Sequence, residues 1–132
     1  MTPFPDDADP APAGPRPWPS GWVRAALEPA ILGVLTAGPL HGYGIAQALA
    51  VRDFGTLRGG SLYPVLGRLE EVGHITARWA PGDAGPGRKD YELTDAGRAA
   101  YRDAIANWRR LGNALADLGA TPRLTAQEGT VR

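Results

Sequence analysis

Apolar residues recur at helical spacing in the first half of the chain, and turn-forming residues separate the apolar stretches. Residues 22–35 are mostly apolar and are predicted to form a first helix, with Pro29 in its first turn or at a kink. Gly38 and Pro39 end that helix, and a short second helix is predicted from about residue 42 to residue 50.

A third helix is predicted over about 59–72, and it ends at Gly73 because glycine favours helix C-termini. Its apolar side chains fall on one stripe that is expected to face the core: Leu62, Val65, Leu66, Leu69 and Val72. The opposite side of the helix carries a different set: Gly60, Tyr63, Pro64, Gly67 and Glu71. Ser61 and Arg68 lie on a flank, so the helix is predicted to have one core face and one outward face.

Two short strands and a last helix complete the predicted fold. The segments 75–79 and 89–93 are predicted as strands, and the glycine-rich residues 81–87 between them as a loop. Thr94 is a good N-cap for a final helix from Asp95 to about Leu118. The order helix, helix, helix, strand, loop, strand, helix predicts a mainly α fold with a small β-wing, namely a winged helix-turn-helix with an appended C-terminal helix.

The two ends of the chain differ in composition from the middle. Residues 1–20 hold seven prolines and three aspartates with almost no aliphatic residue, so a disordered tail is predicted there. A second flexible tail is predicted over 119–132. The winged helix-turn-helix domain is therefore expected over 21–94 and the C-terminal helix over 95–118, which fits a chain of 132 residues with room for one domain.

The chain has no cysteine, which excludes disulfides, thiolate catalysis and zinc-cysteine sites. No apolar run is long enough to span a membrane, and the N-terminal residues lack the pattern of a signal peptide. These features fit a reducing cytosol, and a cytoplasmic location is expected.

Charge gives a mixed signal about nucleic acid. The 14 basic and 14 acidic residues balance to a net charge of zero, which counts against DNA binding because a basic surface is its usual sign. Lys89 is the only lysine, and the other 13 basic residues are arginines. This bias fits either bidentate contacts to phosphate and guanine or the composition of a GC-rich genome.

Enzyme chemistry and metal binding find little support in the sequence. His41 and His74 are the only histidines, the predicted fold separates them, and no cysteine can join them as a metal ligand. Residues 59–63 begin like a nucleophile elbow but lack the closing glycine and a histidine placed as base. The loop 82–87 lacks the strand-then-helix setting of a phosphate-binding loop. No catalytic site, metal site or cofactor is expected.

Three segments in the matching order resemble the PadR family of bacterial transcription regulators. Residues 40–45 (LHGYGI) resemble the start of its second helix, 60–75 (GSLYPVLGRLEEVGHI) its recognition helix, and 87–98 (GRKDYELTDAGR) its wing and the beginning of the last helix. The sequence departs from the family at Gly67, where lysine or another polar residue is common, and at Asp90, where an aromatic residue is usual. Both changes remove groups that can help to hold or position DNA.

The resemblance implies a transcription regulator whose third helix enters the major groove of DNA. On that basis eight residues are expected to contact a double-stranded operator: Tyr43, Gly60, Ser61, Tyr63, Pro64, Arg68, Arg88 and Lys89. Ser61 and Tyr63 have a plainer alternative, as a local helix cap and a partly buried aromatic residue. The whole domain also has an alternative, a winged helix that serves protein–protein contact with weak or no DNA binding.

The last helix carries a heptad pattern over about 24 residues, a length of about 36 Å at 1.5 Å per residue. A seam this long exceeds what the small domain can cover, so a symmetric homodimer is predicted. The expected interface residues are Tyr101, Ala104, Ile105, Trp108, Leu111, Leu115 and Leu118. The alternative is that this helix only caps the core of its own protomer.

The single C-terminal helix is similar to the short-tailed branch of the PadR family, which includes a lactococcal multidrug-responsive regulator. In that relative a tryptophan of this helix lines a pocket at the dimer interface, and Trp108 stands at the matching position. The resemblance implies a repressor released by a small planar aromatic effector, with Trp108, Trp22 and Gly112 as effector-binding residues. Gly112 stands where that relative has an acidic residue, so a preference for cationic drugs does not carry over. The alternative for Trp108 is a plain aromatic core residue.

Overall fold

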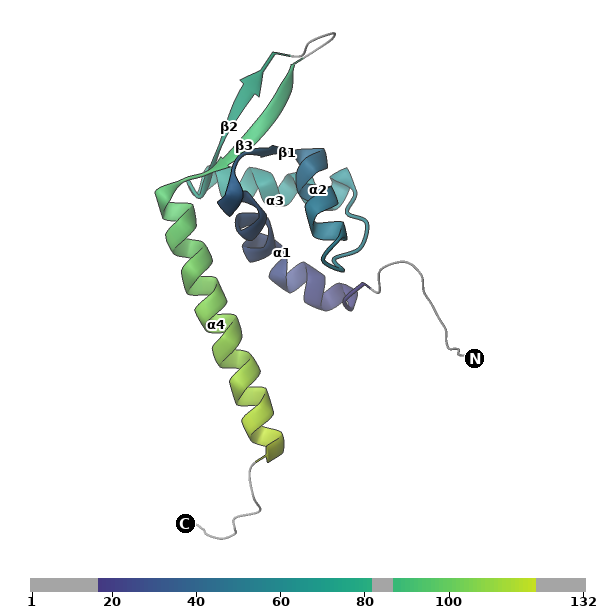
Figure 1. Ribbon diagram of the computed structural model, residues 1–132, viewed down its shortest axis with the longest axis vertical. Coiled ribbons are helices and arrows are strands. Elements are labelled where there is room, and N and C mark those ends of the chain that lie inside the picture. Colours follow the sequence, from purple (N-terminus) through teal and green to yellow (C-terminus); the bar gives the residue numbers. More distant parts are fainter. Residues whose placement is uncertain (1–16, 82–86, 121–132) are drawn as a thin grey trace, which may run out of the picture. The chain divides into compact units, whose positions relative to one another are not determined.

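The computed structural model describes residues 17–81 and 87–120. The helices and strands follow one another in this order (Figure 1): α1 (Ser20–Val34), a 3-10 turn (Leu35–Ala37), β1 (Leu40–His41), α2 (Gly42–Ala50), α3 (Gly59–Glu71), β2 (Ile75–Ala80), β3 (Arg88–Leu93) and α4 (Asp95–Ala120). The prediction of a mainly helical winged helix-turn-helix with a C-terminal helix is confirmed.

The chain divides into two compact units, the first ending at Tyr101 and the second beginning at Arg102. The first unit has one hydrophobic core, to which α1, α2, α3 and the sheet contribute. Its buried members are Leu27, Ile31, Leu32, Leu35, Ile45, Leu49, Leu62, Leu66, Leu69, Ile75, Tyr91 and Leu93. Each helix buries the stripe that its 3.6-residue period places on one face, so the opposite face of α3 stays outside the core.

The sheet has three antiparallel strands in the order β1-β3-β2. Strands β2 and β3 pair from Ile75 opposite Leu93 to Ala80 opposite Arg88, and they form the wing. Strand β1 adds two residue pairs along the other edge of β3. The sequence did not predict β1, because a strand of two residues is too short to show an alternating pattern.

Two local features fix the ends of α3 and the start of α4. Gly73 has a φ of 83°, a left-handed conformation that favours glycine, and it follows α3 as predicted. Thr94 caps α4 as predicted, since its Oγ1 accepts the Gly97 N–H at 3.0 Å. The same hydroxyl donates to the Gly73 carbonyl at 2.7 Å, so one threonine joins the end of α3 to the start of α4.

The prediction that Val72 belongs to the core stripe is wrong. Val72 is 57% exposed, because α3 ends at Glu71 and Val72 follows it as the C-cap residue. Leu62, Leu66 and Leu69 of the same stripe are buried as predicted, and Val65 is partly buried against them.

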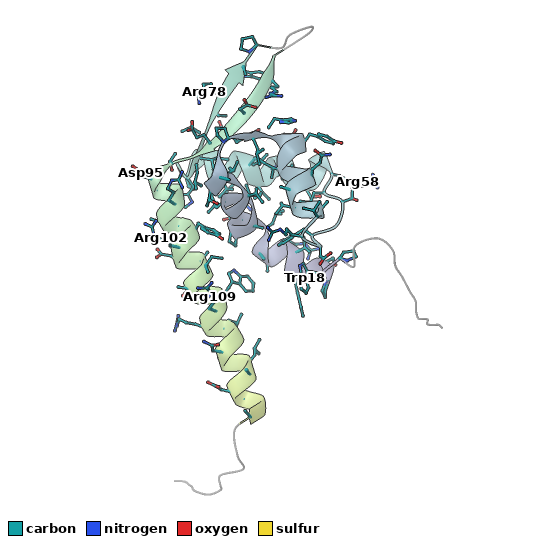
Figure 2. The ribbon with its side chains drawn as sticks, viewed as in Figure 1. Trp18, Arg58, Arg78, Asp95, Arg102 and Arg109 are labelled. Carbon is teal, nitrogen blue, oxygen red and sulfur yellow. The ribbon has the colours of Figure 1, made fainter. Side chains whose placement is uncertain are left out.

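Residues 17–20, which the sequence assigned to the predicted N-terminal tail, are described by the structure, and Ser20 begins α1. Trp18 donates its backbone N–H to the Asp53 carbonyl at 2.8 Å and its indole N–H to the Arg52 carbonyl at 3.2 Å. Its ring also stacks on that of Trp22, with 6.3 Å between ring centroids. Residues 17–19 are therefore anchored on the turn after α2 (Figure 2). The predictions for 1–16, 82–86 and 121–132 lie outside the described residues.

Helix α4 bears a row of large apolar side chains that a single chain leaves exposed. The exposed fraction rises along the helix, from 40% at Trp108 and 50% at Leu111 to 62% at Leu115 and 76% at Leu118. Tyr101, the last residue of the first unit, instead packs on the core of that unit, with its ring against Gly33 of α1. Among the described residues, no helix combines the length and the apolar character needed to cross a membrane.

Candidate nucleic-acid interface

The outward face of α3 is open and includes several small residues. Gly60, Pro64 and Gly67 are exposed. A Cβ atom placed on either glycine would meet no other atom within 4 Å in the described part of the chain. Because small side chains let a helix backbone approach another molecule closely, this face can lie against a broad surface.

The N-terminal end of α3 combines free backbone donors with an arginine. Arg58 is the N-cap residue, and its carbonyl accepts the N–H groups of Ser61 and Leu62, both at 3.0 Å. No side chain caps the helix, which excludes the cap alternative for Ser61 and leaves the first N–H groups for water or an anion. The exposed Arg58 side chain has no hydrogen-bond or ion-pair partner within residues 17–81 and 87–120 (Figure 2).

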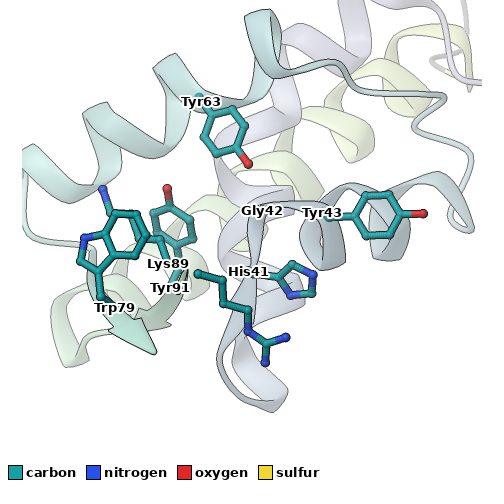
Figure 3. A pocket seen from close by; sticks show the side chains of 8 residues that line it. His41, Gly42, Tyr43, Tyr63, Trp79, Lys89 and Tyr91 are labelled. Carbon is teal, nitrogen blue, oxygen red and sulfur yellow. The ribbon is translucent and has the colours of Figure 1, made fainter. Parts of the chain in front are cut away.

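Tyr63 fixes the distance between α3 and the start of α2. Its hydroxyl points at the backbone of Gly42 (Figure 3). A Cβ atom on Gly42 would lie 2.9 Å from the Tyr63 ring carbon Cζ and closer still to its hydroxyl oxygen. Glycine is therefore required at position 42 for the ring to pack there. Tyr63 is 50% exposed, so the outer edge of its ring can still contact another molecule. The alternative of a partly buried aromatic residue therefore applies only to the inner edge of the ring.

Tyr43, the second residue of α2, points away from the Tyr63 ring (Figure 3) and is 65% exposed. Its hydroxyl oxygen accepts a hydrogen bond from Gln47 Nε2 at 3.1 Å. Because the oxygen acts as acceptor in that bond, its own O–H remains free to donate. The side chain is thus held in place by Gln47 and presents a donor to solvent.

An open hollow of about 440 Å³ lies between the wing and the starts of α2 and α3 (Figure 3). It is lined by His41, Gly42, Tyr43, Tyr63, Trp79, Arg88, Lys89 and Tyr91. Lys89 Nζ lies 5.6 Å from the centroid of the Tyr91 ring, and Trp79 is 70% exposed. Aromatic faces beside two cations suit a partner that has both flat apolar parts and negative charge.

The cations predicted to contact DNA all have carboxylate neighbours. Two hydrogen-bond donors of Arg68 meet Glu28 Oε2 of α1, Nε and Nη2 each at 2.7 Å. Lys89 Nζ lies 3.4 Å from Glu70 Oε1, and Arg88 Nε lies 3.3 Å from Asp90 Oδ1. Arg88 and Asp90 form an ion pair but no hydrogen bond, and the buried Asp90 Oδ1 has no hydrogen-bond partner in the described part of the chain.

Burial raises the pKa of Tyr91 above its ordinary value of 10.0, and the nearby Glu70 carboxylate and Tyr63 phenol raise it further. Like a tyrosine with an ordinary pKa, Tyr91 is therefore neutral at physiological pH. The floor of the hollow therefore carries no negative charge of its own from Tyr91 that would repel an anion.

Sequence reasoning missed Arg58 and Trp79 as site residues. A signal existed for Arg58, which directly precedes the paired glycines Gly59 and Gly60 at the start of α3. No such signal existed for Trp79, because its pairing with Lys89 across the wing depends on the strand register, which the structure shows. Among the described residues, no group of three or more histidine, cysteine or acidic side chains could hold a metal ion.

Comparison with known proteins gives a family match in sequence. The sequence profile described as the transcriptional regulator PadR-like family matches residues 31–103. No curated protein matches the chain.

Solved structures share the fold. A PadR family transcriptional regulator from Eggerthella lenta is 29% identical with a TM-score of 0.70, over 77% of this chain and 88% of that one. A PadR-like transcriptional regulator from Bacillus cereus is 26% identical with a TM-score of 0.67, over 75% and 96%. Bacillus subtilis PadR, solved in complex with operator DNA, is 33% identical with a TM-score of 0.56; the match covers 61% of this chain and 46% of that protein.

Proposed function

Because the chain belongs to the PadR-like family of transcriptional regulators, we propose that it binds double-stranded operator DNA with α3 as the recognition helix. The observation that carries the proposal is the open outward face of α3, which has exposed Tyr43 on one side and the cations of the wing nearby. The operator complex of Bacillus subtilis PadR supports it, since that relative shares the fold.

In this proposal α3 lies in the major groove with its N-terminal end against the base edges. Gly60, Ser61 and Pro64 allow close approach, and the free N–H groups at the helix start attract a phosphate. Tyr43 donates its hydroxyl to a second phosphate. Arg68 reaches a guanine or phosphate from the flank of α3.

The hollow between the wing and α2 holds the sugar–phosphate chain. Lys89 and Arg88 neutralise phosphates there, and the exposed face of Trp79 packs on a deoxyribose. Tyr63 contacts the same strand with its exposed edge. Since α3 carries Arg68 against Glu70 and Glu71, its own net charge is negative, and a large share of the specificity comes from the shape of the DNA.

The test is a titration of duplex DNA from the protein's own upstream region over a range of salt concentrations. Because phosphate contacts release counterions, the association constant should fall steeply and linearly on a log–log plot against salt. An absence of binding to any duplex at low salt would instead favour a winged helix that serves protein contact.

Replacement of both Arg88 and Lys89 by alanine should weaken binding to operator and unrelated DNA alike. Both cations face phosphates in the proposal, so the salt slope should flatten by roughly 1 to 2 units. Arg78→Ala is the matched control, because Arg78 also lies on the wing but pairs with Glu92 at 3.0 Å outside the hollow. A loss confined to the operator would show that the wing reads bases.

The regulator works as a homodimer in this proposal, with the exposed apolar row of α4 as its interface. Its exposed members are Trp108, Leu111, Leu115 and Leu118, and the partly exposed Ala104 and Ile105 extend it toward the start of the helix. Tyr101 stands at its N-terminal end, where the contact with Gly33 covers one side of the ring within the protomer. Dimerisation places two recognition helices on the two halves of a symmetric operator.

We also propose that this chain belongs to the short-tailed branch of the family and acts in the cytoplasm. There it represses transcription until a planar aromatic effector binds and releases it from DNA. Trp108 and Gly112 of α4 and Trp22 of α1 are the proposed effector-binding residues. A Cβ on Gly112 would meet nothing within 4 Å in the described chain, so space exists beside this residue.

Titration of planar dyes tests the effector site through tryptophan emission. Saturable quenching is expected in the native protein and should be lost in Trp108→Phe, because stacking on the indole supplies about 0.5 to 1.5 kcal/mol per ring pair. Trp18, Trp22 and Trp79 emit in both proteins, so the difference between the two curves reports on Trp108. Identical curves would leave Trp108 as a packing residue.

A further inference from the structure

Three of the proposed DNA contacts share a feature that the sequence did not predict. Arg68, Lys89 and Arg88 are each held by one carboxylate, at 2.7, 3.4 and 3.3 Å respectively. Their partners come from three places: Glu28 from α1, Glu70 from α3, and Asp90 from β3 itself. Every cation predicted to touch DNA is therefore paired within its own protomer.

These pairs differ in how much water reaches them. The Arg68 and Glu28 side chains are 54% and 44% exposed, so a phosphate can approach the arginine while the pair stays intact or opens. The Lys89 and Glu70 side chains are only 37% and 34% exposed. Asp90 is 24% exposed, and its Oδ1 lies buried beside Arg88. Each of the three carboxylates therefore lies within contact distance of a cation that is proposed to bind a DNA phosphate or base.

We infer that Glu28, Glu70 and Asp90 restrain the affinity of this regulator for DNA, an inference that rests on the proposed function. A phosphate that binds one of the three cations must share or displace its carboxylate. The carboxylate then remains close to the phosphate and repels it. Because phosphate contacts carry no sequence information, the restraint acts equally on operator and unrelated DNA.

The charge balance of the chain fits this role. A net charge of zero is unusual for a DNA-binding protein, and these pairs place part of the opposing charge at the proposed interface itself. The pair of Arg68 and Glu28 is about half exposed, and exposed ion pairs add little to folding stability, so stability alone gives no strong reason for that pairing. Arg58, at the N-terminus of α3, remains the unpaired arginine of this interface among the described residues.

The test replaces each carboxylate by its neutral amide: Glu28→Gln, Glu70→Gln and Asp90→Asn, singly and together. The amides keep the size of the side chains, and thermal unfolding checks that the fold is retained. Glu92→Gln is the matched control, since Glu92 forms the same kind of ion pair with Arg78, 3.0 Å away and outside the hollow. Binding is measured by fluorescence anisotropy with an operator duplex from the upstream region and an unrelated duplex.

Each single variant should bind both duplexes about threefold to sixfold more tightly than the native protein, the size of one charge–charge repulsion in water at 4 to 6 Å. The triple variant should gain roughly the product of the three. The gain should shrink as salt rises, because the Debye length falls to about 8 Å at 0.15 M. Glu92→Gln should change affinity by less than twofold.

Unchanged affinities in the three variants, or a gain in Glu92→Gln as large as theirs, would overturn the inference while leaving the proposed function intact. A gain on the operator alone would overturn the claim that the restraint is independent of sequence. If the native protein binds neither duplex, retention on heparin decides the point, since heparin is a polyanion without bases. The three variants should then elute at higher salt than Glu92→Gln, and equal elution would reject the restraint.

Discussion

We expect Gly97→Ala to lower the free energy of unfolding by about 2 kcal/mol. A Cβ at position 97 would overlap the carbonyl oxygen of His74 and lie 2.8 Å from Leu93 Cδ1. Overpacking of this kind costs about 3 kcal/mol, and the better helix propensity of alanine returns about 1 kcal/mol. The His74 carbonyl cannot move aside freely, because it accepts the Thr94 N–H at 3.1 Å.

Thermal unfolding followed by circular dichroism measures the effect. A loss of about 2 kcal/mol in a domain of this size lowers Tm by roughly 10 °C. Gly67→Ala is the control, because Gly67 also lies within a helix but a Cβ there meets nothing within 4 Å. That variant should keep or raise Tm. A Tm for Gly97→Ala at or above the native value would show that the corner between α3, the wing and α4 is looser than described.

The order of the helices and of the wing strands, and their bounds to within one or two residues, were predictable from the sequence because they depend on local patterns. Apolar spacing in α3 placed Leu62, Leu66 and Leu69 in the core. Gly73 and Thr94 marked the end of one helix and the start of another through conformation and capping that involve only nearby residues. Such signals depend only on residues a few positions apart in the sequence.

Contacts between residues far apart in sequence were not predictable in this way. Arg68 pairs with Glu28, 40 positions away, and Lys89 pairs with Glu70, 19 positions away. The sequence placed Arg68 on the flank of α3 but gave no means to see that the flank faces α1. For the same reason the packing of Tyr63 on Gly42 was hidden, although both residues belong to the segments that resemble the family.

The candidate site illustrates the same division. Sequence reasoning found Tyr43, Tyr63 and the two wing cations, which the structure brings together around one hollow. It missed Trp79 because an isolated tryptophan in a strand does not show which face it occupies until the register is known. Register depends on pairing with Lys89 across the wing, which is a tertiary property.

Leu115→Arg should convert the protein to a monomer and lower operator affinity by about a hundredfold or more. In the proposed dimer Leu115 lies on the α4 seam, and the variant would bury an arginine near its symmetry mate. Two unpaired like charges at a buried interface cost several kcal/mol, which is comparable with the stability of a small dimer. The monomer then loses the gain from binding two half-sites at once, a factor of about 100 or more.

Analytical ultracentrifugation gives the assembly state, and anisotropy with the operator duplex gives the affinity. Asn113→Arg is the matched control, since it adds the same charge to the same helix at the heptad position farthest from the seam. That control should stay dimeric with native affinity. The first unit has its own core and ends at Tyr101, so circular dichroism should show a folded winged helix in both variants. A Leu115→Arg protein that sediments as a dimer and binds the operator normally would exclude α4 as the dimer interface, and the exposed apolar row of this helix would then need a different partner.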